Sequence, residues 1–195
     1  MPESLEPELQ DYAAQYMRLA EDARSLAQRL DDSRINWTLE PGRWSIGQNL
    51  DHLIKVGGIY LPFLRRAIEE GRAKGITANG PFRYGWLGNY LVSLAEPPPR
   101  RKFRAPKAMR PEARVVAAEV LVGFLTLQDE MQKVIASADG LDLARVKVRS
   151  PITGLVRIPL GRAIALTAAH ERRHLWHSWQ LRKHREFPDP PADAA

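Results

Sequence analysis

Apolar residues recur at spacings of three and four in four long segments of the chain, and this pattern predicts four amphipathic helices. The first segment covers about residues 5–30 and the second about residues 45–74. The third covers about residues 111–140 and the fourth about residues 159–185. Almost no stretch alternates in the way that a half-buried strand does. The sequence therefore predicts an all-α fold.

Start and stop signals support the limits of two of these helices. The run Ser45-Ile46-Gly47-Gln48 has the form of a capping box, in which the serine and glutamine side chains each bind a free backbone amide. Gly75 follows the last apolar position of the same helix, as helix-terminating glycines do. Pro111 suits a first helical position because no N–H donor is needed there, so we expect the third helix to begin at this residue.

Residues 75–110 separate the second and third helices and are rich in Gly, Pro, Trp and Arg, with a short helix expected at residues 87–95. A connection of this length suits a four-helix bundle with one long crossover, because parallel neighbours require a link that travels the length of the bundle. Two short extended pieces are expected at residues 146–148 and 156–158, ahead of the last helix.

Composition limits the fold and the chemistry. With 195 residues and 44% apolar content, the chain is long enough for one substantial core, so we expect a single domain over residues 1–187. Residues 188–195 have no core-forming side chains and are expected to be a mobile tail. The chain has no cysteine, which excludes disulfides, thiolate metal sites and a cysteine nucleophile. A bound metal would therefore be held by histidine, carboxylate or water.

The charge and the hydropathy point away from two classes of partner. A net charge of +6 makes nucleic acid a candidate, but the basic residues are scattered among 23 acids. The densest basic cluster, at residues 100–107, lies in a proline-rich stretch and is expected to be a solvated loop. No apolar run approaches 18 residues and no export leader is evident, so we expect a soluble, cytoplasmic protein without a membrane partner.

The fourth predicted helix carries a concentration of histidines. His170, His174 and His177 fall on its apolar stripe and are expected to face inward. His170 and His174 are one turn apart, so two neutral imidazoles could chelate one divalent ion. Three ligands from one straight helix would span about 10 Å, which is awkward around a single ion. A third ligand is therefore expected from another helix.

His52 is the candidate for that third ligand, because it is the one histidine that lies outside the fourth helix. Its stripe on the second helix also contains Gln48, Val56 and Phe63. A single histidine on an apolar face is more often a hydrogen-bonded core residue than a ligand. The inward His170 and His174 pair strengthens the interpretation of His52 as a ligand.

The segment Trp44-Ser45-Ile46-Gly47-Gln48-Asn49-Leu50-Asp51-His52-Leu53, followed by His170-Glu171-Arg172-Arg173-His174, resembles the DinB/YfiT superfamily of metal-binding four-helix bundles. The resemblance covers most of the chain. It implies that His52, His170 and His174 are the ligands of one divalent ion, which would be zinc, nickel, iron or manganese.

Characterised members of that superfamily include S-transferases and isomerases that use low-molecular-weight thiols such as bacillithiol, mycothiol or glutathione. The resemblance therefore implies a metal-dependent thiol S-transferase that acts on small electrophiles. A metal-dependent hydrolase is an alternative, because a divalent ion can also activate water. Another alternative is a metal-binding, stress-related bundle without enzymatic activity, in the form of a homodimer.

His177 is a departure from the superfamily, whose members often carry glutamine three residues after the last ligand. We treat His177 as the candidate catalytic residue, either as an acid or base or as a hydrogen-bond donor behind a ligand. Alternatively, His177 is an occasional metal ligand, or a partly buried histidine that is hydrogen-bonded to the backbone.

Glu171 completes a formal match to His-Glu-x-x-His, the motif in which a metalloprotease glutamate acts as the general base. On a helix Glu171 points about 100° away from His170, and few residues remain to supply a downstream ligand, so a protease is disfavoured. Further candidates for substrate contacts are the five tryptophans, Tyr12 and Tyr16, and, for an anionic group, Arg83, Arg100 and Arg173.

Overall fold

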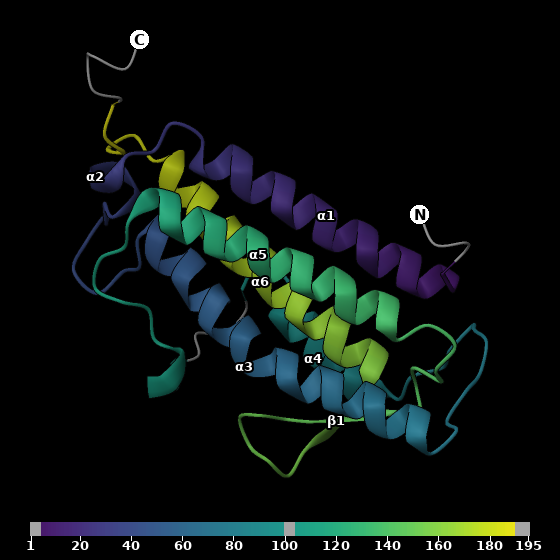
Figure 1. Ribbon diagram of the computed structural model, residues 1–195. Coiled ribbons are helices and arrows are strands. Elements are labelled where there is room, and N and C mark those ends of the chain that lie inside the picture. The colour runs from purple at the N-terminus through teal and green to yellow at the C-terminus, as the bar shows by residue number, and fades with distance from the viewer. Residues whose placement is uncertain (1–4, 100–103, 190–195) are drawn as a thin grey trace.

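The protein is represented by a computed structural model that describes residues 5–99 and 104–189. Four long helices dominate it, and they confirm the predicted all-α fold: α1 (Pro7–Ala27), α3 (Ile46–Ala73), α5 (Ala117–Ser137) and α6 (Leu160–Arg182). Helices α1 and α3 each pack against both α5 and α6, so the four form a closed bundle around one core. Figure 1 shows α3 and α5 running in one direction and α1 and α6 in the other.

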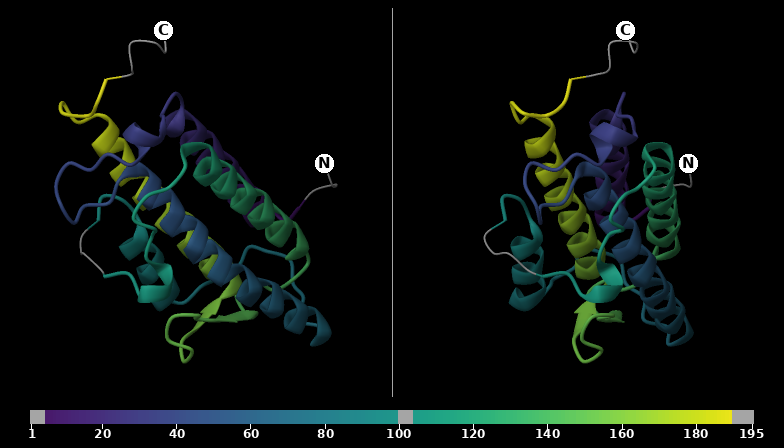
Figure 2. Two further views of the ribbon diagram at one scale, coloured as in Figure 1. Left: turned by 60° about the vertical axis from the view of Figure 1, so that its left-hand side comes forward. Right: turned by 90° about the vertical axis from the view of Figure 1, so that its left-hand side faces the viewer.

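Shorter elements lie in the connections between the long helices: α2 (Asp32–Ile35), α4 (Trp86–Ala95), the 3₁₀-helix η1 (Lys107–Met109), β1 (Lys147–Arg149) and β2 (Arg157–Pro159). Helix α4 lies outside the bundle against α6, and the antiparallel β1–β2 hairpin lies near the start of α6 (Figure 2). The short helix expected in the crossover is confirmed. The two extended pieces are also present, each one residue further along the chain than predicted.

The core consists of side chains from all four long helices, which together form one large apolar cluster. Tyr16, Leu53, Phe124 and Ile164, one from each helix, are almost fully buried within it. The predicted mobile tail lies largely outside the described residues, although the carbonyl of Pro188 accepts a hydrogen bond from Arg34 Nε at 3.0 Å. No helix of the described residues has the length and apolar character needed to span a membrane.

Helix α3 begins as predicted. The Ser45 hydroxyl accepts from the Gln48 amide at 3.1 Å, while the Ser45 amide donates to the Gln48 side-chain oxygen at 3.1 Å. This reciprocal pair is the capping box that the sequence predicted. It fixes the start of the helix that carries His52.

The predicted start of the third long helix was wrong, since α5 begins at Ala117 and not at Pro111. Side chains from elsewhere bind the backbone that a helix would otherwise use. The Val115 amide donates to Asn36 Oδ1 at 2.9 Å, and Asn36 Nδ2 donates to the Val115 carbonyl at 2.7 Å. The Ala117 amide then donates to Asp32 Oδ1 at 2.7 Å, so Asp32 caps α5 from outside the helix.

Candidate metal centre

His52 lies on α3 and is buried, with 4% of its surface exposed. Its Nδ1 lies 2.6 Å from the carbonyl oxygen of Met109 in η1. Because a carbonyl can only accept, Nδ1 carries the hydrogen of the neutral ring and Nε2 keeps the free lone pair. The crossover therefore fixes both the tautomer and the orientation of His52.

His174 is oriented in the same way by a side chain of α3. Its Nδ1 lies 2.7 Å from Oδ1 of Asn49, whose Nδ2 donates to the carbonyl of Ser45 at 2.8 Å. The second bond sets the orientation of the amide, so that its oxygen faces the imidazole. Nε2 of His174 is consequently the nitrogen with a free lone pair.

The imidazoles of His52, His170 and His174 converge from the two facing helices α3 and α6. One ligand nitrogen from each lies within 4.8 Å of the other two. The ring centroids of His52 and His174, and those of His170 and His174, are 4.6 Å apart. Neutral nitrogens held by hydrogen bonds on the opposite side of the ring are the donors that zinc-type ions prefer. The group is thus compatible with a bound divalent ion.

Burial disfavours protonation of these histidines. It lowers the pKa of His170 to about 3, with smaller contributions from the charges of His52 and Arg173. Burial also lowers the pKa of His52 and, well below its ordinary value, that of His174. All three rings are therefore neutral at pH 7, which is the protonation state that metal binding requires.

His177 lies beside this group and not within it. Its ring centroid is 6.2 Å from that of His174, one turn nearer the end of α6. Burial, together with the charges of Arg173 and Arg43, lowers the pKa of His177. The structure places the ring at the cavity wall, and its catalytic role stays a prediction.

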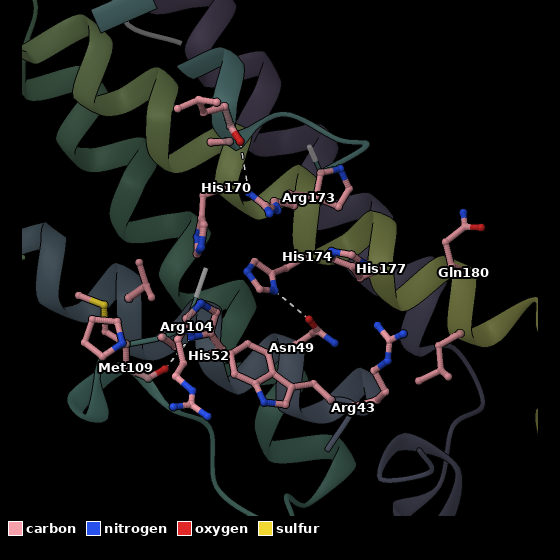
Figure 3. A pocket seen from close by; sticks show the side chains of 18 of the residues that line it. Arg43, Asn49, His52, Arg104, Met109, His170, Arg173, His174, His177 and Gln180 are labelled. Atoms are coloured by element: carbon pink, nitrogen blue, oxygen red, sulfur yellow. Dashed lines mark hydrogen bonds between the residues drawn. The ribbon is translucent and has the colours of Figure 1, made fainter. Parts of the chain in front are cut away.

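The three histidines line a cavity of about 1220 Å³ that lies between α3, α4, α6 and the loop that precedes α3 (Figure 3). Trp44 forms part of its wall, with its ring centroid 4.8 Å from that of His52 and 5.8 Å from that of His174. The volume is larger than an ion requires and is sufficient for a small-molecule substrate.

Glu171 does not belong to this cavity, despite the match to His-Glu-x-x-His. Its side chain is 4% exposed and does not line the cavity. It lies in the bundle interior, where burial raises its pKa to about 8 and where Gln128 is its neighbour. A metalloprotease base would have to face the ion, so the geometry argues against that alternative.

The other candidates for substrate contacts differ in where they lie. The Tyr12 hydroxyl donates to Glu8, and the Tyr16 hydroxyl bonds Thr167 Oγ1 at 2.7 Å within the core. Arg83 is not part of the cavity wall, Arg173 is part of it, and Arg100 lies outside the described residues.

Asn49, Met109 and Arg43 contribute to the site but were not predicted from the sequence. Asn49 precedes His52 by three residues and so shares its helical face, which is a local signal for a supporting partner. Met109 acts through its backbone carbonyl, and Arg43 reaches the cavity from a loop. Neither of these two carries a signal in the sequence.

The sequence model of the DinB superfamily matches residues 15–178, a span that contains the three converging histidines. Neither the curated proteins nor the solved structures gave a match.

Proposed function

This chain belongs to the DinB superfamily, and from that premise we propose that it is a divalent-metal-dependent enzyme that transfers small electrophiles to a low-molecular-weight thiol. The observation that carries the proposal is the convergence of His52, His170 and His174 at the wall of a cavity. Three protein nitrogens leave coordination positions open, as catalytic sites do and closed structural sites do not. A divalent ion held there would supply Lewis-acid chemistry, which keeps a thiol sulfur deprotonated near neutral pH.

In the proposed reaction the thiol sulfur attacks an electrophilic carbon and forms a carbon–sulfur bond. The bond to the leaving group breaks, and the leaving group departs with the electron pair. The thiol proton goes to the neutral imidazole of His177, which lies beside the ligand group and is accessible from the cavity. Trp44 and the other apolar side chains of the wall provide an apolar surface beside the reacting atoms.

Metal content is the first test. Protein purified without a polyhistidine tag is supplied in turn with zinc, nickel, iron and manganese, and the bound metal is measured by mass spectrometry. We expect about one ion per chain for the wild type and a loss of at least about tenfold in affinity for His52→Ala. His184→Ala is the matched control, because His184 also lines the cavity but is not one of the converging group. Equal, low metal content in the wild type and His52→Ala would overturn the proposal.

A panel of thiols with a generic electrophile is the second test. Metal-loaded protein is expected to turn over only when a thiol is present, and His177→Gln is expected to lower kcat while leaving the metal content unchanged. Turnover without thiol would replace the transferase with a metal-dependent hydrolase. Metal binding without any turnover would support a non-enzymatic metal-binding protein in its place.

Three narrower expectations belong with this proposal and have their own measurements. The identity of the ion follows from the metal panel. A homodimer is expected, and light scattering at several protein concentrations tests it. A cytoplasmic location is expected and would be checked by fractionation of cells that express the protein.

A further inference from the structure

The wall of the cavity that contains the three histidines has both apolar and cationic side chains. Val56, Tyr60 and Met109, which line it, form a small apolar cluster of their own, separate from the main core of the bundle. Leu91 and Leu94 of α4 also line the cavity, so the crossover helix presents apolar side chains to it. These side chains can accept an apolar body and offer it few polar partners.

Helix α4 is held in place by the two arginines between His170 and His174. Arg172 Nε donates to Glu96 Oε2 at 3.0 Å, and the second donor of the fork binds the other carboxylate oxygen. Arg173 Nη1 donates to the carbonyl of Leu94 at 3.2 Å. The apolar wall is therefore anchored to the helix that carries His170 and His174.

The cavity wall also carries cationic side chains. Arg43, Arg104 and Arg173 lie on different sides of the cavity (Figure 3), and Glu40 is the one acidic residue among the described residues that line it. Arg43 Nε lies 2.8 Å from Glu40 Oε1, but this pair is exposed to solvent and therefore weak. The cavity wall thus has a net positive charge.

Arg43, Arg173 and His177 all line the cavity, so two guanidinium groups are available beside the converging histidines. An anion in the cavity would gain charge-assisted hydrogen bonds from these groups, which are stronger than hydrogen bonds between neutral partners.

We propose that the cavity selects an amphiphilic anion, with its apolar body against Leu91, Leu94 and Met109 and its anionic group facing Arg43 and Arg173. This inference rests on the proposed function in one respect, which is that the cavity is a substrate site. It assigns the chemical class of the electrophile, namely a small molecule that has an apolar portion and a carboxylate or similar group. Binding of that class requires no ion.

Displacement of the neutral fluorescent probe N-phenyl-1-naphthylamine from chelator-treated protein tests the preference. Octanoate, octanol and octylamine have the same chain and differ in charge. We expect octanoate to displace the probe at about tenfold lower concentration than octanol, and octylamine to be the weakest. The affinity of carboxylates should rise about fourfold for each methylene between butanoate and octanoate. Equal displacement by octanoate and octanol would overturn the inference.

Variants locate the preference within the cavity. Arg43→Gln and Arg173→Gln are both expected to remove most of the octanoate advantage over octanol, and Arg43→Gln, which leaves the anchor of α4 intact, is expected to leave the affinity for octanol unchanged. Arg173→Lys keeps the charge and should keep most of the advantage, which separates charge from the anchoring of α4. Arg66→Gln is the matched control, because Arg66 is an exposed arginine of α3 that does not line the cavity. An equal loss in Arg66→Gln would contradict the assignment.

The failures of the two proposals can be told apart. Loss of the octanoate preference with metal bound at His52, His170 and His174 would reject the anion site and leave the metal site standing. A retained preference in protein that binds no metal would reject the metal-dependent enzyme and leave the anion site standing.

Discussion

Asn49 of α3 and His174 of α6 meet across the interface of the two helices, with Oδ1 and Nδ1 2.7 Å apart. The amide is itself held by its bond to the Ser45 carbonyl, so the capping turn of α3 is connected to His174, a proposed ligand on the opposite helix. A partner of this kind fixes the ring orientation and raises the basicity of the ligand nitrogen. Asn49 is therefore expected to set the metal affinity without touching the ion.

We expect Asn49→Ala to weaken metal binding by about 10- to 100-fold, because His174 loses its hydrogen-bond acceptor. Competition with a chromophoric chelator measures the affinity. Thermal unfolding of the metal-free variant separates this effect from a loss of stability. Asn89→Ala changes an exposed amide of α4 and should leave the affinity unchanged. Identical affinities of the wild type and Asn49→Ala would show that His174 needs no such support.

We expect His177 to act as a base and His174 to act as a metal ligand. His174→Gln should reduce metal content strongly, whereas His177→Gln should keep the metal and lower kcat by about 10²-fold or more, as the loss of a general base does. The acidic limb of the pH–rate profile should also disappear in His177→Gln. Loss of metal in both variants would instead make His177 a ligand.

Because Glu171 is buried, we expect the free energy of unfolding to depend on pH. Its pKa is raised from 4.5 to about 8 in the folded protein. Between these pH values the folded state binds more protons than the unfolded chain, so the free energy of unfolding falls as pH rises from about 4.5 to 8. In Glu171→Gln this loss is absent. We expect the free energy of unfolding of the variant to rise relative to that of the wild type across that window, by an amount on the order of 4 kcal/mol at its upper end.

Urea unfolding at pH 5, 6, 7 and 8 measures the difference. Glu69→Gln, which alters an exposed glutamate of α3, provides the baseline for removing one carboxylate. Parallel stability curves for the wild type and Glu171→Gln would mean that the carboxyl is ionised in the folded protein.

Gly57 and Gly58 are adjacent on α3 and are expected to respond to alanine in opposite directions. A Cβ at Gly57 would lie 2.4 Å from Cδ1 of the buried Leu127 on α5, whereas a Cβ at Gly58 would have no atom within 4 Å. Gly57→Ala should lower the free energy of unfolding by about 1–3 kcal/mol through overpacking. Gly58→Ala should raise it by about 0.5–1 kcal/mol through helix propensity.

Chemical denaturation of the two variants measures both changes against the same wild type. The double variant Gly57→Ala/Leu127→Ala should recover part of the loss relative to the sum of the two single changes, because the clash is removed. A stabilising Gly57→Ala would mean that α3 and α5 pack less closely than described.

Local patterns in the sequence were sufficient for much of the fold. The apolar periodicity, the Ser45 and Gln48 capping box and the short crossover helix were all predicted, because each depends on residues within a few positions of one another. The prediction failed at residues 111–116, where the local signal of Pro111 was outweighed by hydrogen bonds from Asn36 and Asp32. Such partners are distant in the sequence and have no periodicity that reveals them.

The same division applies to the candidate site. By itself the sequence determined that His170 and His174 share one helical face and that His52 faces inward on another helix, since helical spacing alone decides both. Only the tertiary structure decided that these rings converge, that Asn49 and Met109 fix two of them, and that Arg43 reaches the same cavity. It also decided that Glu171 faces the core. Helix packing, which brings side chains from separate segments together and removes water from them, is the physical reason.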